Sequence, residues 1–475
     1  MASSVILNGF NWSQNRFIKL LATTIVFVYA VITTGATAAS TTAANWSSWP
    51  VYPGSWEAFL SGTILVVIGH QLLTAIAGIL LFVTAGVALK TETSRPVRWF
   101  VAIGATLFPL QIILGALLVT GRFGVTSQIH LLVATVIFGT LLVALGWTLE
   151  GHGSSKKTDS LHQTIHSQSR DSAEKASQVT GQQYGWIATA KTYLELTKPR
   201  LMWLLCLLAL AGMALATIAG SRPVGLTVVA TLAGGVLAIG ASGTFNHVAE
   251  RERDRKMERT ADRPVATDQI PRRNATAFGI FLLVLSMIVM VTLVNVIAAV
   301  LTLVAIGYYS VLYTVILKPN TSWNIALGGG AGALPAVIGW AAVTGSIGLP
   351  ALVLAGLVVV WTPAHFYNLA IVYRDDYARA GYPMYPVVSG VSAARKRILT
   401  MLGMTLLTTV FLLHVTPLGW LFAISTIVVG GIFLGTLVRQ CLIRTDTATL
   451  RTFHASNAYL GVVLLAIVIE AIVSL

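Results

Sequence analysis

Residues 246–264 carry oxygen-bearing and basic side chains at a spacing of four residues. Asn246, Glu250 and Asp254 form one series. A second series consists of Arg251, Arg255, Arg259 and Arg263. In a helix, residues four apart stack on one face, so the two series would make adjacent stripes turned by about 100°. The residue before a proline is disfavoured in a helix, so Pro264 predicts that the helix ends near Arg263.

This pattern suits a diphosphate that is held together with a magnesium ion. Carboxylate and amide oxygens bind Mg²⁺, whose remaining ligands are usually phosphates of the substrate. Guanidinium groups bind phosphate oxygens through paired hydrogen bonds. The alternative is a solvated helix end held by local ion pairs such as Arg251–Asp254 and Arg255–Glu258.

A second acidic patch follows an apolar run that ends near residue 370. His365, Asp375 and Asp376 lie in this stretch. Ionisable groups at the ends of membrane helices are costly and are usually functional. Two carboxylate clusters that meet over one cavity would suit a Mg²⁺-diphosphate, whereas a chance pair of loop carboxylates is the alternative for Asp375 and Asp376.

The composition shows which elements must position these residues. Of 475 residues, 55% are hydrophobic and 10% are charged, and the mean hydropathy is +0.78, which excludes a soluble domain. Lipid offers no partner to an unpaired backbone group, so an all-α, polytopic membrane protein is predicted. We place about 13 spans of about 20 residues, near 18–38, 60–88, 97–119, 128–149, 201–220, 223–245, 275–294, 296–316, 322–343, 349–370, 397–415, 418–438 and 453–473.

The net charge of +14 does not indicate a nucleic-acid-binding protein, because the basic residues follow the membrane topology. Lys and Arg collect in alternate loops, whereas most short loops between them carry none. The positive-inside rule then places the basic loops, and with them both acidic patches, on the cytoplasmic side of a plasma membrane. Two distant cysteines, Cys206 and Cys441, predict neither a disulfide framework nor a zinc site.

The chain divides at a polar stretch. Residues 151–183 are rich in Ser, Gln, His and Lys and lack apolar periodicity, which is typical of a flexible linker. We predict a four-helix unit at 1–150, a cytoplasmic linker at 151–190 and a nine-helix unit at 191–475. The first apolar run is longer than the core of a signal peptide and three spans follow it, so a retained span is favoured over a cleaved leader.

From about residue 197 onward, the sequence resembles the protoheme IX farnesyltransferases of the UbiA-type membrane prenyltransferase superfamily. The resemblance runs in order through nearly all nine predicted helices. One departure is Glu250, where the family usually has the shorter aspartate. The motifs are Leu196-Thr-Lys198-Pro199-Arg200, Asn246-x3-Glu250-x3-Asp254-x2-Met257-x-Arg259-Thr260-x2-Arg263-Pro264, Tyr313-Thr-x2-Leu317-Lys318, Asn324-Ile-x-Leu-Gly328, Trp361-x-Pro-x-His365-Phe, Asp376-Tyr377-x2-Ala-Gly381-x2-Met384 and Phe453-x2-Ser456-x2-Tyr459-Leu460.

The resemblance implies transfer of a farnesyl group from farnesyl diphosphate to a vinyl group of heme B, with water completing the side chain of heme O. It implies that Asn246, Glu250 and Asp254 hold one Mg²⁺, and that Asp376, together with Asp375, holds another. Metal and guanidinium charge would stabilise the departing diphosphate without a covalent enzyme intermediate. The residues implied to bind substrate are Lys198, Arg200, Arg259, Arg263, His365 and Tyr377. For His365, a contact to heme iron or to a propionate and a structural hydrogen-bonded role both remain open.

The first 150 residues resemble one half of heme A synthase. The resemblance lies in His70, in Gln111-x2-Leu114-Gly115 and in His130-Leu131. Two histidines on neighbouring helices of a bundle can supply both axial ligands of a heme. However, Gln71 replaces the usual arginine, and the second four-helix half of that family is absent from the sequence. We therefore expect a heme-binding or scaffolding unit rather than an oxidase, with heme A synthase or a terminal-oxidase assembly as its partner.

Two other functions agree with parts of the sequence. A UbiA-type enzyme could act on a quinone or lipid precursor, although the motifs from Lys198 to Tyr459 argue against that acceptor. A b-type membrane cytochrome built on His70 and His130 would explain the histidines but not the acidic patches. Farnesyl transfer to heme is therefore the predicted function.

Overall fold

The computed structural model describes residues 13–40, 63–119, 127–151 and 185–474. Every regular element in these residues is helical, and 13 of the helices are long and apolar enough to cross a membrane. The predicted all-α, polytopic architecture is confirmed. Most of the predicted linker, residues 152–184, lies outside the described residues.

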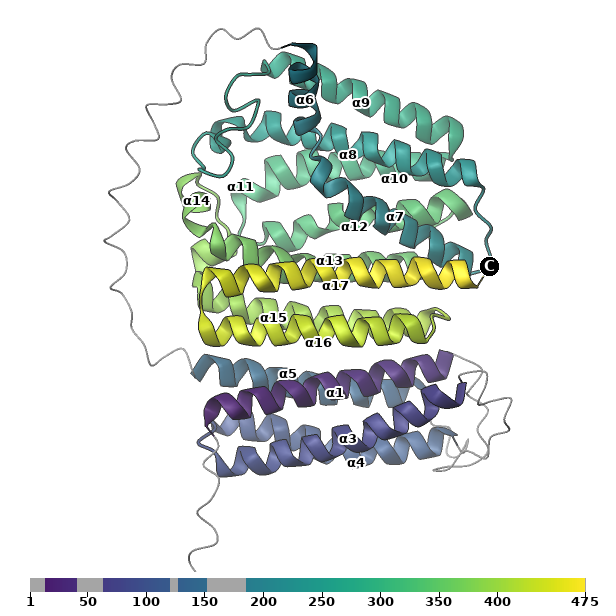
Figure 1. The fold of residues 1–475 in the computed structure, drawn as a ribbon, viewed down its shortest axis with the longest axis vertical. Coiled ribbons are helices and arrows are strands. Elements are labelled where there is room, and N and C mark those ends of the chain that lie inside the picture. The colour runs from purple at the N-terminus through teal and green to yellow at the C-terminus, as the bar shows by residue number, and fades with distance from the viewer. Residues whose placement is uncertain (1–12, 41–62, 120–126, 152–184, 475) are drawn as a thin grey trace, which may run out of the picture.

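The spanning helices lie side by side and run alternately in opposite directions (Figure 1). The first unit comprises α1 Gln14–Ser40, α3 Thr63–Lys90, α4 Arg95–Val119 and α5 Ser127–Gly151. The second comprises α6 Trp186–Leu196, α7 Pro199–Ile218, α8 Gly225–Asp254, α9 Arg272–Leu293, α10 Val296–Gly307, the π-helix η3 Tyr308–Leu317, α11 Lys318–Asn320, α12 Asn324–Thr344, α13 Leu349–Val372, α14 Arg374–Arg379, α15 Tyr385–Val415, α16 Trp420–Ile443 and α17 Asp446–Val473.

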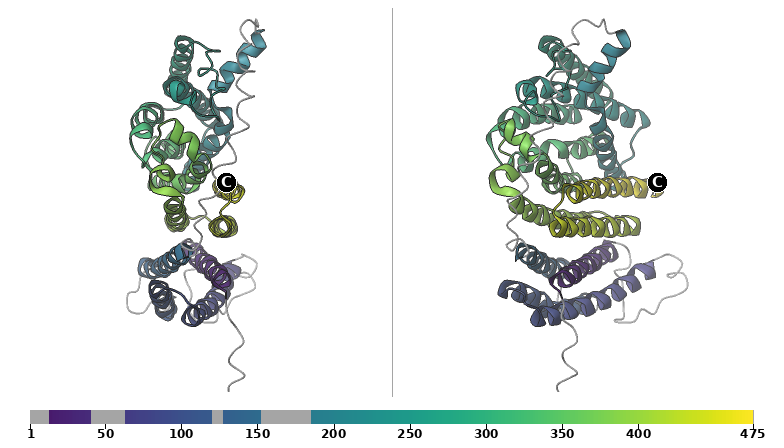
Figure 2. Two further views of the ribbon diagram at one scale, coloured as in Figure 1. Left: turned by 90° about the vertical axis from the view of Figure 1, so that its left-hand side faces the viewer. Right: turned by 60° about the vertical axis from the view of Figure 1, so that its left-hand side comes forward.

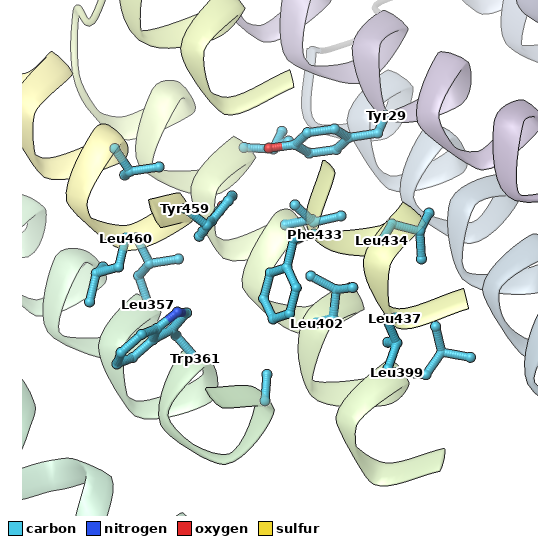
Figure 3. Packing of buried hydrophobic residues seen from close by; sticks show 14 of the residues in the cluster. Tyr29, Leu357, Trp361, Leu399, Leu402, Phe433, Leu434, Leu437, Tyr459 and Leu460 are labelled. Atoms are coloured by element: carbon cyan, nitrogen blue, oxygen red, sulfur yellow. The ribbon is translucent and has the colours of Figure 1, made fainter. Parts of the chain in front are cut away.

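The first unit packs on the second through α15 and α16. Helix α1 contacts both of them, and α5 contacts α15. One cluster of buried hydrophobic side chains continues across this junction (Figure 3). Within it, Tyr29 of α1 and Tyr459 of α17 both lie against Gly430 of α16. Figures 1 and 2 place the first unit at the opposite end of the stack from α8 and α9.

The central helices of the second unit approach one another through glycines. A Cβ added to Gly212 of α7 would lie 2.1 Å from the carbonyl oxygen of Ala336 on α12. A Cβ added to Gly339 of α12 would lie 2.0 Å from the carbonyl oxygen of Ala209. Small residues let membrane helices pack backbone to backbone where lipid supplies no hydrophobic driving force between them. This contact fixes α7, which begins directly after Lys198 of the site.

Two helix starts differ most from the sequence prediction. Helix α15 begins at Tyr385 rather than near 397, with a non-helical Gly390 at φ +82° inside it. Helix α6 begins at Trp186, inside the segment predicted as linker, and its end is anchored by the buried Leu196. Both additions are polar or amphipathic turns beyond the apolar runs. Hydropathy detects the part of a helix that spans the lipid and misses such extensions.

Candidate active site

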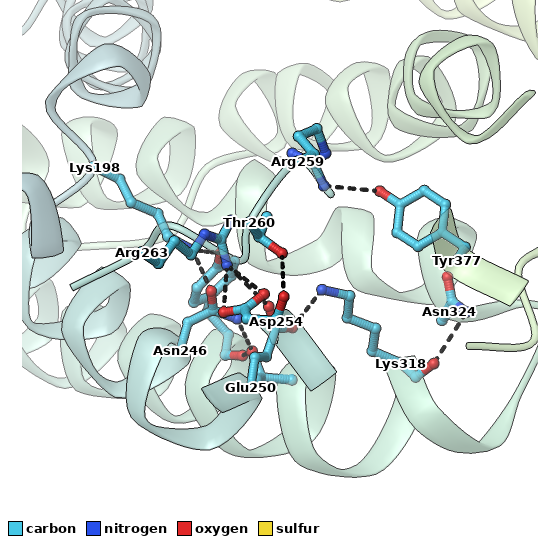
Figure 4. A network of polar contacts seen from close by, with 12 residues as sticks. Lys198, Asn246, Glu250, Asp254, Arg259, Thr260, Arg263, Lys318, Asn324 and Tyr377 are labelled. Atoms are coloured by element: carbon cyan, nitrogen blue, oxygen red, sulfur yellow. Dashed lines mark hydrogen bonds and ion pairs between the residues drawn. The ribbon is translucent and has the colours of Figure 1, made fainter. Parts of the chain in front are cut away.

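The last turns of α8 carry three oxygen-bearing side chains into the protein interior. Asn246, Glu250 and Asp254 are 2%, 4% and 2% exposed. They belong to one polar network at the end of the bundle where the α8–α9 loop and α14 also lie (Figures 1 and 4). The four-residue spacing puts them on one helix face. Buried carboxylates require compensating charge, and the neighbouring segments supply it.

The chain after α8 folds back on itself, so the predicted continuation of the helix to Arg263 is wrong. Arg263 Nη1 lies 2.8 Å from Asp254 Oδ2 and 3.6 Å from Glu250 Oε2. In a continuous helix, residues nine apart are separated by roughly 13 Å along the axis, which is too far for an ion pair. The hydroxyl of Thr260 also donates to the carbonyl oxygen of Asp254, at 3.3 Å. These contacts favour the fold-back over another two helical turns.

The predicted arginine stripe therefore separates into two groups. Arg251 and Arg255 form ion pairs with Asp268 across the loop. Their Nε atoms donate to the carbonyl oxygens of Val265 and Ala266, at 3.2 and 2.7 Å. These two arginines fasten the loop to the end of α8, whereas the next arginines of the series face the site or its rim.

Lys198 reaches the site from the turn between α6 and α7. Its Nζ donates to Asn246 Oδ1 and, at 3.3 Å, to the hydroxyl of Tyr309. The Lys198 backbone is left-handed, with φ +55°, a conformation that costs a non-glycine residue about 1 kcal/mol and that gathers at functional sites. The turn can approach α8 because residue 243 is glycine; an added Cβ there would lie 2.9 Å from the carbonyl oxygen of Leu196.

The wall beside α8 is the π-helix η3 and the residue that follows it. Thr314 Oγ1 accepts a hydrogen bond of 3.1 Å from Asn246 Nδ2, and Lys318 forms an ion pair with Glu250. Sequence reasoning placed none of Tyr309, Thr314 and Lys318 in the site. Tyr309 and Thr314 are five residues apart, which an α-helix would turn to different faces. Short π-helical segments are frequent at functional sites.

Tyr382, in the turn after α14, completes the enclosure of the cations. Its ring centre lies 4.7 Å from Lys318 Nζ and 5.1 Å from Arg253 Cζ. Burial raises the pKa of Tyr382 to about 12, so the phenol stays neutral at physiological pH. A neutral aromatic face holds a cation without removing its charge from the site.

Asp376 joins the site through the loop after α8. It is 6% exposed, and its carboxylate accepts hydrogen bonds from the backbone N–H groups of Glu258 and Arg259, at 3.2 and 3.3 Å. Arg379 pairs with the same carboxylate. Asp376 thus holds the loop that carries Arg263. This loop connects the two acidic patches, which lie at the same end of the helices.

Asp375 and Tyr377 flank Asp376 but differ in environment. The side chain of Asp375 is 72% exposed and pairs with Arg374 at 3.3 Å, outside the network. Tyr377 is buried, and its hydroxyl accepts a 3.5 Å hydrogen bond from Arg259 Nη2. Arg259 therefore lies at the rim of the site, exposed on its outer side.

The donor set at the end of α8 fits one divalent cation. Glu250 and Asp254 share a single cationic atom, Arg263 Nη1, so their oxygens already converge on one position. Mg²⁺ is commonly held by one or two carboxylates together with substrate phosphates, and Asn246 offers a third oxygen. In the part of the chain that the structure describes, no three His, Cys, Asp or Glu side chains gather around one metal position.

The second Mg²⁺ at Asp376 and Asp375 stays a prediction, and the two carboxylates have different partners in this structure. The Asp376 oxygens are engaged by two backbone N–H groups and by Arg379. Asp375 turns away from them, toward Arg374. The structure therefore gives Asp376 a role in holding the loop.

Two other predicted substrate-binding residues lie apart from this network. His365 is 4% exposed, stacks between Trp361 and Phe453 with ring centres 4.4 and 4.2 Å away, and shares a 2.6 Å hydrogen bond with Ser456. These contacts are those of a structural histidine. Arg200 is exposed on the first turn of α7 and forms no ion pair among the described residues.

The two histidines of the first unit lie close together. His70 of α3 and His130 of α5 are near enough to interact electrostatically. The His70 ring packs against Gly35 of α1, and the His130 ring against Gly115 of α4. Gln111 donates to the His130 carbonyl oxygen at 2.9 Å, whereas His130 Nδ1 is buried without a hydrogen-bond partner among the described residues. Each of the two imidazole rings thus lies against a glycine of a neighbouring helix.

Comparison with known proteins identifies the family of this chain. The sequence profile of the UbiA prenyltransferase family matches residues 184–461. The protoheme IX farnesyltransferase of Haloarcula marismortui is 47% identical over 463 residues, which cover 97% of this chain and 99% of that relative. Protoheme IX farnesyltransferase 1 of Natronomonas pharaonis is 48% identical over 458 residues, which cover 96% of this chain and 98% of that relative.

A shorter relative and a solved structure match part of the chain. Protoheme IX farnesyltransferase 1 of Saccharopolyspora erythraea is 43% identical over 288 residues, or 60% of this chain and 90% of that relative. The structure of a digeranylgeranylglyceryl phosphate synthase covers 60% of this chain and 98% of its own, with a TM-score of 0.50 and 14% identity. At that identity, the likeness shows the fold alone.

Proposed function

Because the chain belongs to the UbiA prenyltransferase family and, within it, to the protoheme IX farnesyltransferases, we propose that it transfers a farnesyl group to heme B at the end of α8. The observation that carries this proposal is a buried oxygen-bearing face surrounded by cations that come from three other segments. The oxygens are those of Asn246, Glu250 and Asp254, and the cations are Lys198, Arg263 and Lys318. This balance of charges suits a Mg²⁺-diphosphate.

Two groups of residues would bind the Mg²⁺-diphosphate: one binds the metal ion and the other binds the phosphate oxygens. Glu250 and Asp254, with Asn246, would hold a magnesium ion, which supplies electrophilic charge beside the diphosphate when it is bound. Lys198 and Arg263 can exchange their present oxygen partners for phosphate oxygens. Lys198 is held by Tyr309 of η3 and Lys318 by the ring of Tyr382, so their charge is directed before the substrate binds, which is electrostatic preorganisation.

The reaction follows from this arrangement. The C1–O bond of farnesyl diphosphate breaks and diphosphate leaves, while a carbon of the heme vinyl group forms a bond to C1. The cation left beside the porphyrin ring takes up water, which loses a proton and becomes the hydroxyl of heme O. Lys198, Lys318 and Arg263 stabilise the negative charge that develops on the leaving group. No covalent bond to the protein is required.

The site lies on the cytoplasmic side of the plasma membrane in this proposal. The loop 255–270 and α14 lie at one end of the stack. The loops and adjoining helix ends on this side carry most of the Lys and Arg residues. Since positive loops remain in the cytoplasm, a water-soluble diphosphate head can reach the site from there while the farnesyl chain stays in the lipid.

The direct test is product analysis. The purified protein in lipid vesicles is supplied with heme B, farnesyl diphosphate and Mg²⁺, and the hemes are analysed by mass spectrometry. Heme O is the expected product. Prenylation of a quinone precursor offered in parallel, with heme B unchanged, would contradict the proposed acceptor while leaving prenyl transfer intact.

We propose that the first unit binds a heme between His70 and His130, as a store or donor for the second unit. The full-length protein should then show the difference spectrum of a low-spin heme with two histidine ligands. His70→Ala and His130→Ala should each abolish it, because each removes one axial ligand. His454→Ala, on α17, is the matched control and should keep it. Identical spectra for all four proteins would remove the histidine pair from any heme site.

A chain that begins near residue 183 is expected to keep the reaction at saturating substrate. Removal of an even number of spans leaves the sidedness of the second unit unchanged. Much of the surface that α15 and α16 bury against α1 and α5 is apolar, and after the truncation it would meet lipid instead. The relative from Saccharopolyspora erythraea, whose matched 288 residues make up 90% of its length, supports a self-sufficient second unit.

The measurement is heme O formation at saturating and at scarce heme B. We expect an unchanged kcat and a KM for heme that is raised several-fold, because a tethered heme-binding unit raises the local heme concentration. The full-length His70→Ala/His130→Ala protein separates heme supply from packing, since it keeps the junction. A truncated protein that inserts and folds but is inactive at saturating substrates would show that residues 1–150 take part in the chemistry.

A further inference from the structure

A polar cavity lies where the two helical units meet. Its volume is about 270 Å³, and α5, α15 and α16 contribute to its wall. The charged lining residues are Glu150 at the end of α5, Arg395 and Lys396 on α15, and Arg444 directly after α16. None of these residues belongs to the site at α8 or to the histidine pair.

The charges that line this cavity do not balance. Lys396 forms an ion pair with Glu150 and so links the two units. Arg444 donates to the carbonyl oxygen of Cys441 at 3.2 Å and forms no ion pair among the described residues. Arg395 Nε is buried and has no hydrogen-bond partner among the described residues, although the Asp446 carboxylate is near enough to interact with it by charge.

A buried guanidinium N–H without an acceptor is rare in proteins and implies a partner that the described residues do not supply. Three cations face one lining carboxylate, so the missing partner is an anion. The lining also includes the apolar Leu149 and Leu399. The cavity therefore offers cationic donors beside an apolar surface.

We propose that this cavity binds a phosphate group and that the natural source is the head group of an anionic phospholipid. Arg395 and Arg444 supply forked donors that match phosphate oxygens. Basic pockets between membrane helices at the cytoplasmic surface are a recurrent site for lipid head groups. A phosphate held by α15 and α16 beside the Lys396–Glu150 pair would brace the junction between the two units.

The test measures binding of phosphatidylglycerol to the full-length protein in detergent by native mass spectrometry. Arg395→Gln is expected to weaken binding by about tenfold, because it removes a charged forked donor. Arg444→Gln, at an exposed position, should weaken it several-fold and remains informative if the Arg395 variant does not fold. The matched control is Arg439→Gln, which removes an exposed arginine of α16 that does not line the cavity.

Two further arms distinguish the source of the phosphate. Phosphatidylcholine is expected to bind at least several-fold more weakly than phosphatidylglycerol, and inorganic phosphate should compete only at high concentration. Inorganic phosphate that binds as tightly as the lipid, with the same losses in the two variants, would support the phosphate site and assign it to a soluble ligand. Equal phosphatidylglycerol binding by the wild type, Arg395→Gln and Arg444→Gln would overturn the proposal.

Discussion

Replacement of Asp254 by alanine is expected to abolish prenyl transfer, reducing kcat by about a thousandfold or more. Asp254 supplies one of the two buried carboxylates that converge on Arg263. Its removal takes away an oxygen ligand for magnesium and frees Arg263 from its position. The measurement is single-turnover formation of heme O over a range of Mg²⁺ concentrations.

The structure also provides the controls for this prediction. Asp254→Asn keeps the shape of the side chain, so it tests the charge even if the alanine variant is unstable. Asp268→Ala removes a carboxylate from the same loop that pairs with Arg251 and Arg255 away from the site, and a loss of only a few-fold is expected. Near-normal turnover of Asp254→Asn at ordinary Mg²⁺ concentrations would show that this carboxylate holds no metal.

The second large effect is expected at Glu250. Glu250→Gln should lose most of the activity, because the neutral amide weakens the metal site and leaves Lys318 buried without its carboxylate. Breaking a buried ion pair by removing one partner costs roughly 3–5 kcal/mol; the side chains of Glu250 and Lys318 are only 5% and 14% exposed. Glu250→Asp, which restores the residue usual in the family, should retain measurable activity.

A double-mutant cycle separates catalysis from stability at this pair. Lys318→Met and Glu250→Gln should each lower the unfolding temperature, whereas the double variant should lose less than the sum of both, since no unpaired charge remains. Glu252→Gln, an exposed neighbour on α8, is the control and should have little effect. Full activity of both Glu250→Asp and Glu250→Gln would remove Glu250 from the site.

Some of the residues in these tests could be identified from the sequence alone, and others could not. The α8 series was readable because four-residue spacing is a property of a single helix, which local sequence determines. The membrane class and the number of spans were readable for a related reason. Lipid requires each span to satisfy its own backbone groups, so every span leaves an apolar run that can be seen in the sequence.

The cations that pair with the polar side chains of α8 could not be identified from local sequence. Lys198 and Lys318 are 48 and 68 residues away from their hydrogen-bond partners, and no local pattern joins residues so far apart. Lys318 stood within a motif of the family resemblance but had no role there. Its role became visible only when the π-helix turned Thr314 and Lys318 toward the buried face.

The arginines and the second acidic pair show the opposite case, in which residues that a sequence pattern groups together lie in different environments in the structure. The spacing of Arg251 to Arg263 is that of one helical stripe, yet attraction between Arg263 and Asp254 bends the chain back after α8. Asp375 and Asp376 are neighbours in sequence, but only Asp376 finds backbone N–H groups to bind.

The sequence by itself determined the membrane-spanning architecture, the series on α8 and the candidate reaction. The tertiary structure decided which cations meet which carboxylates, that His365 lies in an aromatic stack, and that a basic cavity forms between the two units. The physical reason is range. Helix formation and lipid exposure depend on neighbouring residues, whereas a buried charge is stabilised by whatever opposite charge the folded chain brings within a few ångströms.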